Sequence, residues 1–339
     1  MNEAQKSHIL EVAKKIEVPN QVTKTPLVSV IVQTFNQEDT IAQCLESILI
    51  QKTDFDFEIL VGEDFSSDRT RQICTNYAVN YPSKIRLFRH TGNDKIHFGG
   101  KPTGRFNTYT NLFNARGKYL AICEGDDHWN GPDKLQKQAD AFESDPSIGL
   151  CFHAVYINHF GRIHDDSNDA TTKKYESISD KENITYKTLL QLNNYIHTAS
   201  IMLRRKDLVE NIENLPLESP ALDIILSLIA SSEGRIHKIQ GRYATYRLGI
   251  GVWSSMPEWE KQMKWKWVLK SMLDLDFLDA EDRQGINLSL DQLDHAALKS
   301  IQSWTVWEHL KHQIRISILN SPFLRRGYME YQKVRRFLN

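Results

Sequence analysis

Three acidic side chains are crowded into one short segment, Glu124-Gly125-Asp126-Asp127, directly after the apolar run 119–123. Carboxylates this close repel one another unless a cation or a cationic ligand lies among them. Hard oxygen donors suit Mg²⁺ or Mn²⁺, which bind one or two carboxylates together with phosphate oxygens. The simpler alternative is an acidic turn that caps a helix, but the apolar run before the segment and Trp129 after it favour a metal site.

Polar side chains also follow two other predicted strands. The segment Gln33-Thr34-Phe35-Asn36 follows the first strand, and Glu63-Asp64 follows the second. A carboxylate such as Asp64 can accept a hydrogen bond from a nucleobase N–H, and Phe35 can pack on the base. Two alternatives stay open: the segment Ser66-Ser67-Asp68 merely caps the next helix, and an aromatic side chain after a strand is more often part of the core.

Two cationic side chains, Lys101 and Arg105, lie in the glycine-containing segment 92–110, which is predicted to be a long loop. Either of them could contact a diphosphate. Surface solvation is an equally good account of each one alone. The segment has neither the P-loop pattern nor a G-x-G-x-x-G pattern, so neither of these nucleotide-binding motifs is present.

Asp223 stands near the start of a predicted helix, in Ser219-Pro220-Ala221-Leu222-Asp223. Ser219 suits an N-cap and Pro220 the first helical position. The helix dipole favours an acid in the first turn, which is one explanation of Asp223. The other is a general base held rigidly at a helix start, and composition does not choose between them.

Alternating strands and helices must position these side chains. Apolar runs predict strands at 27–32, 57–62, 85–88, 119–123 and 148–157, and apolar periodicity predicts helices at 40–51, 68–78 and around 135–142. The alternation predicts an α/β fold with a mostly parallel central sheet and helices on both faces. In such folds ligands bind beyond the carboxyl ends of the strands, where the candidate residues lie.

The remaining parts of the chain carry less pattern. The segment 158–180 is polar and charged and is predicted to be exposed, and from Pro257 onward the sequence reads as helical. We therefore expect an N-terminal extension over 1–25, a catalytic domain over 26–255 and a C-terminal helical region over 256–339.

Composition limits the classes of protein that the chain can be. Its 339 residues hold 42 Lys and Arg against 43 Asp and Glu, with 40% hydrophobic residues. These values exclude wholesale disorder, and a net charge of −1 argues against a generic nucleic-acid binder. No apolar run approaches the ~20 residues of a membrane span, and residues 1–21 lack the apolar centre of a secretory signal.

We therefore expect a cytoplasmic protein, or one peripheral to the inner face of the cell membrane. The four cysteines, which are widely spaced and form no C-x-x-C pair, are expected to be buried free thiols.

Together these segments resemble the family 2 glycosyltransferases, inverting enzymes with the Rossmann-like GT-A fold. The resemblance covers about Pro26 to Ser255. It rests on the first strand with its Gln33-Thr34-Phe35-Asn36 end, on the segment 58–70 around Glu63-Asp64, on Glu124-Gly125-Asp126-Asp127, which resembles the D-x-D region, and on Tyr246-Arg247 followed by 251–254.

The resemblance implies roles for particular residues. Gln33, Phe35, Asn36 and Asp64 would bind the nucleotide, Glu124 would lie by the ribose, and Asp126 or Asp127 would hold Mn²⁺ or Mg²⁺ on the diphosphate. Arg105 would contact a phosphate, and Asp223 would be the base that deprotonates the acceptor hydroxyl. Trp129, His197, Arg247 and Trp253 are further candidates for the donor or acceptor site.

The sequence departs from the family pattern at three places. Glu63 and Glu124 stand where an Asp is usual, and each keeps a carboxylate. Many relatives have a histidine shortly after the Tyr-Arg step, whereas Leu248-Gly249 follows here.

The implied function is metal-dependent, inverting transfer of a hexosyl or N-acetylhexosaminyl group from a nucleoside-diphosphate sugar, expected to be UDP-linked. The acceptor would be a glycan or a lipid-linked molecule of bacterial surface polysaccharide or lipopolysaccharide. Two alternatives are a catalytically silent nucleotide-sugar-binding or scaffold protein and a sugar nucleotidyltransferase. The second would need a glycine-rich basic loop after the first strand, and Gln33-Thr34-Phe35-Asn36 is not one.

The last 39 residues suggest a separate surface. From Ile301 to Asn339, seven Lys and Arg side chains face only Glu308 and Glu330, with aromatic residues between them. Such a segment could rest on an anionic membrane. An ordinary helical cap or a homodimer contact with a solvated basic face accounts for it at least as well.

Overall fold

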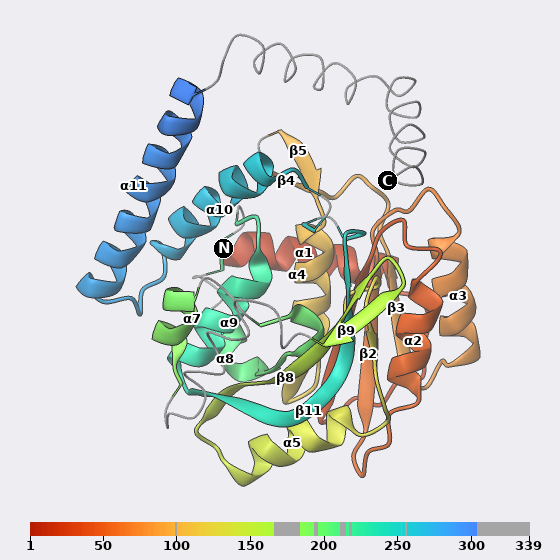
Figure 1. The fold of residues 1–339 in the computed structure, drawn as a ribbon. Helices are drawn as coiled ribbons and strands as arrows, with labels where there is room; N and C mark the ends of the chain where they lie inside the picture. The colour runs from red at the N-terminus through yellow and green to blue at the C-terminus, as the bar shows by residue number, and fades with distance from the viewer. Residues whose placement is uncertain are drawn as a thin grey trace. The chain divides into compact units, whose positions relative to one another are not determined.

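A computed structural model of the chain describes residues 1–98, 100–165, 184–192, 196–210, 215–216, 219–251, 253–254 and 256–303 (Figure 1). Contacts divide the chain into two compact units, Met1–Ile286 and Asn287–Asn339. The larger unit contains the sheet and every candidate site residue. The predicted basic segment over 301–339 lies almost wholly outside the described residues, and the predicted boundaries at 25 and 255 stay predictions.

A mixed sheet forms the centre of the larger unit, in the spatial order β3-β2-β1-β6-β10-β8-β11-β7, with β9 paired to β8. Its strands are β1 (Val28–Thr34), β2 (Phe57–Glu63), β3 (Ile85–Arg89), β6 (Tyr119–Ile122), β7 (His128–Trp129), β8 (Ile148–His159), β9 (Arg162–Asp165), β10 (Met202–Arg204) and β11 (Arg235–Leu248). The first four strands in this order are parallel, β10 is antiparallel to both neighbours, and β11 is parallel to β8. A separate hairpin joins β4 (Ile96–Phe98) to β5 (Lys101–Thr103).

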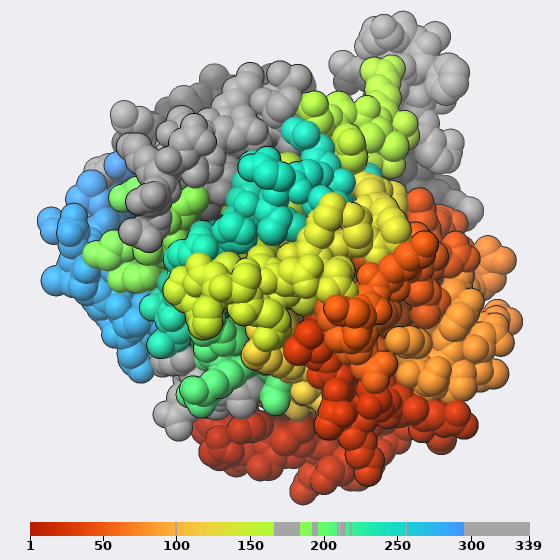
Figure 2. All heavy atoms as spheres, turned by 90° about the horizontal axis from the view of Figure 1, so that it is seen from below, coloured from red at the N-terminus to blue at the C-terminus, as the bar shows by residue number. Residues whose placement is uncertain are grey.

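Helices cover both faces of the sheet. The helices of the described residues are α1 (Glu3–Ile16), α2 (Ile41–Leu49), α3 (Thr70–Asn80), α4 (Arg105–Asn114), α5 (Lys134–Ser144), α7 (Tyr186–Leu192), α8 (Arg205–Glu210), α9 (Leu222–Ser232), α10 (Glu258–Met272) and α11 (Ala280–Ser303). Seen from below, α5 in yellow and β11 in teal lie side by side (Figure 2). No helix in the described part of the chain combines the length and apolar character that a membrane crossing requires.

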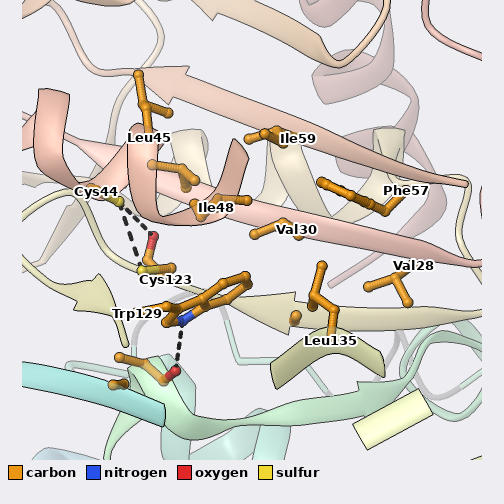
Figure 3. Packing of buried hydrophobic residues seen from close by; sticks show 14 of the residues in the cluster. Val28, Val30, Cys44, Leu45, Ile48, Phe57, Ile59, Cys123, Trp129 and Leu135 are labelled. Atoms are coloured by element: carbon orange, nitrogen blue, oxygen red, sulfur yellow. Dashed lines mark hydrogen bonds between the residues drawn. The ribbon is translucent and has the colours of Figure 1, made fainter. Parts of the chain in front are cut away.

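Strands β1 and β2 are buried along almost their whole length, as their apolar-rich sequences predict. All seven residues of β2 are buried, and so are six of the seven in β1. Burial on both faces is typical of parallel strands covered by helices. Ile48 of α2, Val30 of β1, Ile59 of β2, Trp129 and Leu135 of α5 meet in the resulting core (Figure 3).

The structure confirms the predicted α/β fold and adds elements that the sequence pattern did not show. The segment 92–110, expected to be a loop, contains the β4–β5 hairpin and the start of α4. The α4 helix was missed because its buried face carries the polar side chains of Asn107, Thr110 and Asn111, which interrupt the apolar periodicity. The α9 helix begins later than predicted, with Ala221 rather than Ser219 at its N-cap position.

One buried cation stands out within the core. Lys134 is fully buried, donates a hydrogen bond of 2.7 Å to Gln138 Oε1, and its Nζ lies 4.1 Å from the centre of the Trp129 ring. Burial lowers the pKa of Lys134 from 10.5 to about 7. Among the described residues no carboxylate forms an ion pair with Lys134, so its charged form is stabilised by dipoles and by the aromatic ring.

This burial predicts a pH dependence of stability. Because the unfolded chain binds the Lys134 proton more tightly, it holds more protons than the folded protein between pH 7 and 10.5, and the free energy of unfolding should rise with pH through that window. We expect a slope on the order of 1 kcal/mol per pH unit that Lys134→Met abolishes and the exposed control Lys137→Met retains. Urea denaturation at several pH values measures it; equal slopes in the wild type and Lys134→Met would contradict the prediction.

Candidate active site

A cavity of about 1520 Å³ lies beyond the carboxyl ends of β1, β2 and β6. Nine of the residues predicted from the sequence line it: Gln33, Phe35, Asp64, Arg105, Glu124, Asp126, His197, Asp223 and Trp253. They come from segments up to 220 residues apart, Gln33 to Trp253, and only the folded sheet brings them together. Asn36, Asp127, Trp129 and Arg247 do not line the cavity in the described structure.

Carboxylates dominate the deep part of the cavity. Burial raises the pKa of Glu124 to about 8, and the negative charges of Asp126 and Asp223 contribute to that rise. Burial also raises the pKa of Asp126, although the positive charge of Arg247 opposes the effect. The negative charges of Asp126 and Asp223 therefore disfavour ionisation of Glu124. A bound cation would reduce this repulsion.

Asp127 faces away from the cavity and holds the neighbouring strand. Its Oδ1 accepts a 2.8 Å hydrogen bond from the backbone N–H of Arg247 in β11, and its Oδ2 is buried without a hydrogen-bond partner. The guanidinium of Arg247 in turn donates to the carbonyl oxygen of Asp126 and to Gln43 Oε1 of α2. Arg247 thus fixes the acidic turn from outside the cavity rather than lining it.

The acidic turn fits a divalent cation in part. Within the described residues, no group of three or more His, Cys, Asp and Glu side chains converges closely enough to hold a metal by itself. The carboxylate of Asp126 lines the cavity. The next residue, Asp127, has a buried carboxylate oxygen, Oδ2, that accepts no hydrogen bond. In nucleotide complexes Mg²⁺ and Mn²⁺ are commonly coordinated by one or two carboxylates together with phosphate oxygens.

Asp64 also lines the cavity, directly after β2. Its Oδ1 is 2.5 Å from Lys95 Nζ, which also donates to the Asp64 carbonyl oxygen at 3.3 Å. Burial raises the pKa of Asp64, whereas Lys95 opposes the rise. Phe35 lines the same region with 51% of its surface exposed, so it belongs to the cavity wall and not to the core.

Asn36 and Glu63 build the two loops that carry Phe35 and Asp64. Asn36 adopts a positive φ of 50°, and its Oδ1 accepts a 2.8 Å hydrogen bond from Ser67 N–H. Glu63 is fully buried, accepts a 2.6 Å hydrogen bond from Ser66 N–H, and pairs with Arg71. Asn36 therefore ties the loop after β1 to the loop after β2, whereas Glu63 fixes the loop after β2 and the start of α3. Both residues shape the wall indirectly.

Asp223 occupies the first turn of α9, where the sequence placed it. Burial raises its pKa, while a 3.2 Å hydrogen bond from Thr198 Oγ1 to Oδ2 and the positive charge of Arg105 oppose the rise. Arg105 is 8% exposed at the first position of α4, and its Nε has no hydrogen-bond partner. Its electrostatic partners are Tyr109 and Asp223, so the guanidinium acts on the Asp223 side of the cavity.

The aromatic candidates separate into two groups. Trp129 belongs to the core, because its two-residue strand turns the ring inward and its Nε1 donates a 3.0 Å hydrogen bond to the Ala199 carbonyl (Figure 3). Trp253 and His197 line the cavity, and the His197 ring lies 4.8 Å from the Tyr246 ring.

Several cavity residues had no signal in the sequence. Lys95 and Thr198 are isolated in the chain and reach the site only through tertiary structure. Tyr246 also lines the cavity, although the sequence marked it only as part of the Tyr246-Arg247 segment and assigned it no role. A second group, consisting of Phe98 of β4 together with Lys264 and Trp265 of α10, lines the part of the wall made by the hairpin and that helix. The tryptophan-rich sequence around 259–267 was visible, but its proximity to the site was not.

Two asparagines of α4 hold the helix against the strands that end at the cavity. Asn107 Nδ2 donates to the Gly62 carbonyl oxygen at 2.8 Å, and Asn111 Nδ2 donates to the Val32 carbonyl oxygen at 3.1 Å. A Cβ at Gly62 would lie 1.7 Å from Asn107 Oδ1 and 2.8 Å from Asn111 Nδ2. Glycine at this position therefore permits the close approach that places Arg105 in the cavity.

Comparisons with known proteins agree with this architecture. The family model described as "Glycosyl transferase family 2" matches residues 29–212. An uncharacterized protein of Mycobacterium tuberculosis is 30% identical over 228 residues, which is 67% of this chain and 60% of that protein. The chain thus spans about three fifths of the length of this relative.

Solved structures share the fold at low sequence identity. TarS 1–349 of S. aureus, in complex with UDP-GlcNAc, has a TM-score of 0.55 and 21% identity over 76% of this chain and 70% of that chain. The mannosyltransferase PcManGT of Pyrobaculum calidifontis, in complex with GDP-Man and Mn²⁺, has a TM-score of 0.55 and 17% identity over 96% and 89%. These likenesses confirm the GT-A architecture that the sequence predicted.

The close packing at Gly62 gives a test of how the site is held. Gly62→Ala should lower the free energy of unfolding by about 1–3 kcal/mol, because the added methyl displaces Asn107 and with it the start of α4. Gly285→Ala is the control, since a Cβ there meets nothing within 4 Å in α11 and should be neutral or slightly stabilising. Urea denaturation compares the two variants, and a Gly62→Ala protein as stable as the control would contradict the argument.

Proposed function

This chain belongs to glycosyl transferase family 2, and we propose that it is a metal-dependent, inverting glycosyltransferase. The donor is a nucleoside-diphosphate sugar, expected to be UDP-linked, and the transferred group is a hexosyl or N-acetylhexosaminyl unit. The acceptor is a hydroxyl of a glycan or lipid-linked molecule in surface polysaccharide assembly.

One observation carries this proposal: a single cavity brings together Asp64, Asp126 and Asp223, from the ends of β2 and β6 and the start of α9. These are a base-binding acceptor, a metal-binding carboxylate and a candidate general base, at different parts of one wall. One structural neighbour is in complex with a UDP-sugar and the other with a GDP-sugar and Mn²⁺, which supports a donor of this class.

Each residue then has a defined task. Asp64 accepts the N–H of the base, Phe35 packs on the base, and Gln33 and Glu124 contact the nucleoside. Asp126, with Asp127 behind it, would hold Mn²⁺ or Mg²⁺. When bound, that cation would stabilise the negative charge that develops on the leaving nucleoside diphosphate.

Asp223 would act on the acceptor. Its carboxylate takes the proton of the acceptor hydroxyl while that oxygen attacks the anomeric carbon, and a single displacement inverts the configuration. The Thr198 hydroxyl donates to Asp223 Oδ2 and orients the carboxylate. The positive charge of Arg105 favours the ionised form against the effect of burial, and the ionised form is the one that can accept a proton.

The first test is donor binding. With Mn²⁺, one or more of a panel of UDP-, GDP- and dTDP-sugars should raise the thermal unfolding temperature and release nucleoside diphosphate in the presence of an acceptor. EDTA should abolish release. Binding without release under any acceptor would favour the silent-binding alternative, and pyrophosphate formation from a sugar phosphate and a nucleoside triphosphate would favour a nucleotidyltransferase.

The second test concerns the base. Asp223→Asn should keep donor affinity while transfer falls by about 10²–10⁴-fold, because an amide cannot accept the proton. Asp207→Asn is a matched control, since burial also raises the pKa of Asp207, to about 6, but its side chain lies outside the cavity. Donor binding by calorimetry and transfer by product analysis separate the two effects; unreduced transfer in Asp223→Asn would exclude it as the base.

A further inference from the structure

The α10 helix exposes large apolar side chains on its outer face. Trp259, Met263 and Trp267 are 52%, 54% and 44% exposed and recur every four residues, so they lie along one stripe. The opposite face packs inward through Val268, Leu269 and Met272. A helix at the surface of a globular domain normally carries polar residues on its outer face.

Positive charge accompanies this stripe. The α10 sequence contains four lysines against two glutamates, and one of those glutamates, Glu260, pairs with Lys264. Lys270 is exposed and places its Nζ 5.1 Å from the centre of the Trp267 ring. Tryptophan and lysine together are typical of helices that lie at the boundary between lipid headgroups and acyl chains.

The same helix forms part of the cavity wall. Lys264 and Trp265 line the cavity, as does Phe98 of the β4–β5 hairpin. The Phe98 and Trp267 rings meet edge to face at 5.4 Å, which ties the hairpin to the helix (Figure 1). The exposed stripe thus lies on the outer side of an element whose inner side borders the candidate active site.

We propose that α10 binds the surface of an anionic lipid bilayer, with Trp259, Met263 and Trp267 at the headgroup boundary and Lys266 and Lys270 toward the lipid phosphates. Charge complementarity favours this occupant over a neutral apolar protein surface. The role of the contact rests on the proposed function: it would bring the cavity to the plane in which a lipid-linked acceptor lies. The contact itself is independent of catalysis and can be tested without any sugar.

Vesicle sedimentation of the full chain tests the proposal. Binding to phosphatidylglycerol-containing vesicles should exceed binding to pure phosphatidylcholine vesicles and should weaken between about 0.05 M and about 0.5 M salt. Trp259→Glu with Met263→Glu should lower the partition coefficient at least about 10-fold, because two charges would replace the buried apolar contacts. Lys266→Glu with Lys270→Glu should lower it selectively for the anionic vesicles.

A matched control is available on α3. Val79 is 67% exposed and apolar, so Val79→Glu should leave vesicle binding unchanged. All variants should keep the wild-type unfolding temperature and donor affinity, which separates a failure of this proposal from a failure of the proposed function. Equal binding by the wild type and the α10 variants would overturn the proposal. A second result would also overturn it: light scattering finds a wild-type dimer that the α10 substitutions dissociate, and neither the dimer nor the monomer binds vesicles.

Discussion

The burial of several carboxylates at the end of β6 is the constraint on which the rest of the site depends. Glu124, Asp126 and Asp127 are adjacent in the chain, and burial raises the pKa of each of them. Bringing like charges out of water is unfavourable unless hydrogen bonds and cations compensate. The surrounding structure supplies part of that compensation, through the Arg247 backbone and guanidinium, and leaves the cavity side of Asp126 for a ligand.

The strands after β6 in the chain bring Arg247 of β11 to the acidic turn. The β10 strand reverses direction between β6 and β8, so that β11 can run parallel to β8 and end beside the acidic turn. The short β7 strand continues from that turn and pairs with β11 through Trp129 opposite Ala244. The Trp129 ring is buried in the core and anchors the residues that follow the turn. Arg247 holds the turn itself through its hydrogen bonds to Asp126 and Asp127.

Much of the fold could be predicted from the sequence, because the buried parallel strands are rich in apolar residues and the helices between them have regular apolar faces. The cavity position of Asp64, Glu124 and Asp126 could be predicted as well, since the carboxyl ends of such strands meet at one edge. Asp223 lies at a helix start, and its role was implied only by the resemblance to the family. The α4 helix could not be predicted, because Asn107 and Asn111 are polar but lie on its buried face and interrupt the apolar periodicity. Asp126 and Asp127 could not be distinguished either, because which one faces the cavity is decided by β11, about 120 residues later.

The reach of Arg247 also has a consequence for the order in which the molecule is assembled. Its guanidinium joins Gln43 of α2 to the carbonyl of Asp126, although 204 residues separate Arg247 from Gln43. A nascent chain that has emerged only as far as β6 already contains β1, β2, β3 and β6, which pair with one another in parallel. The acidic turn acquires its final hydrogen bonds only after β11 has been synthesised and paired, so the candidate site is completed later than the strands whose ends it joins.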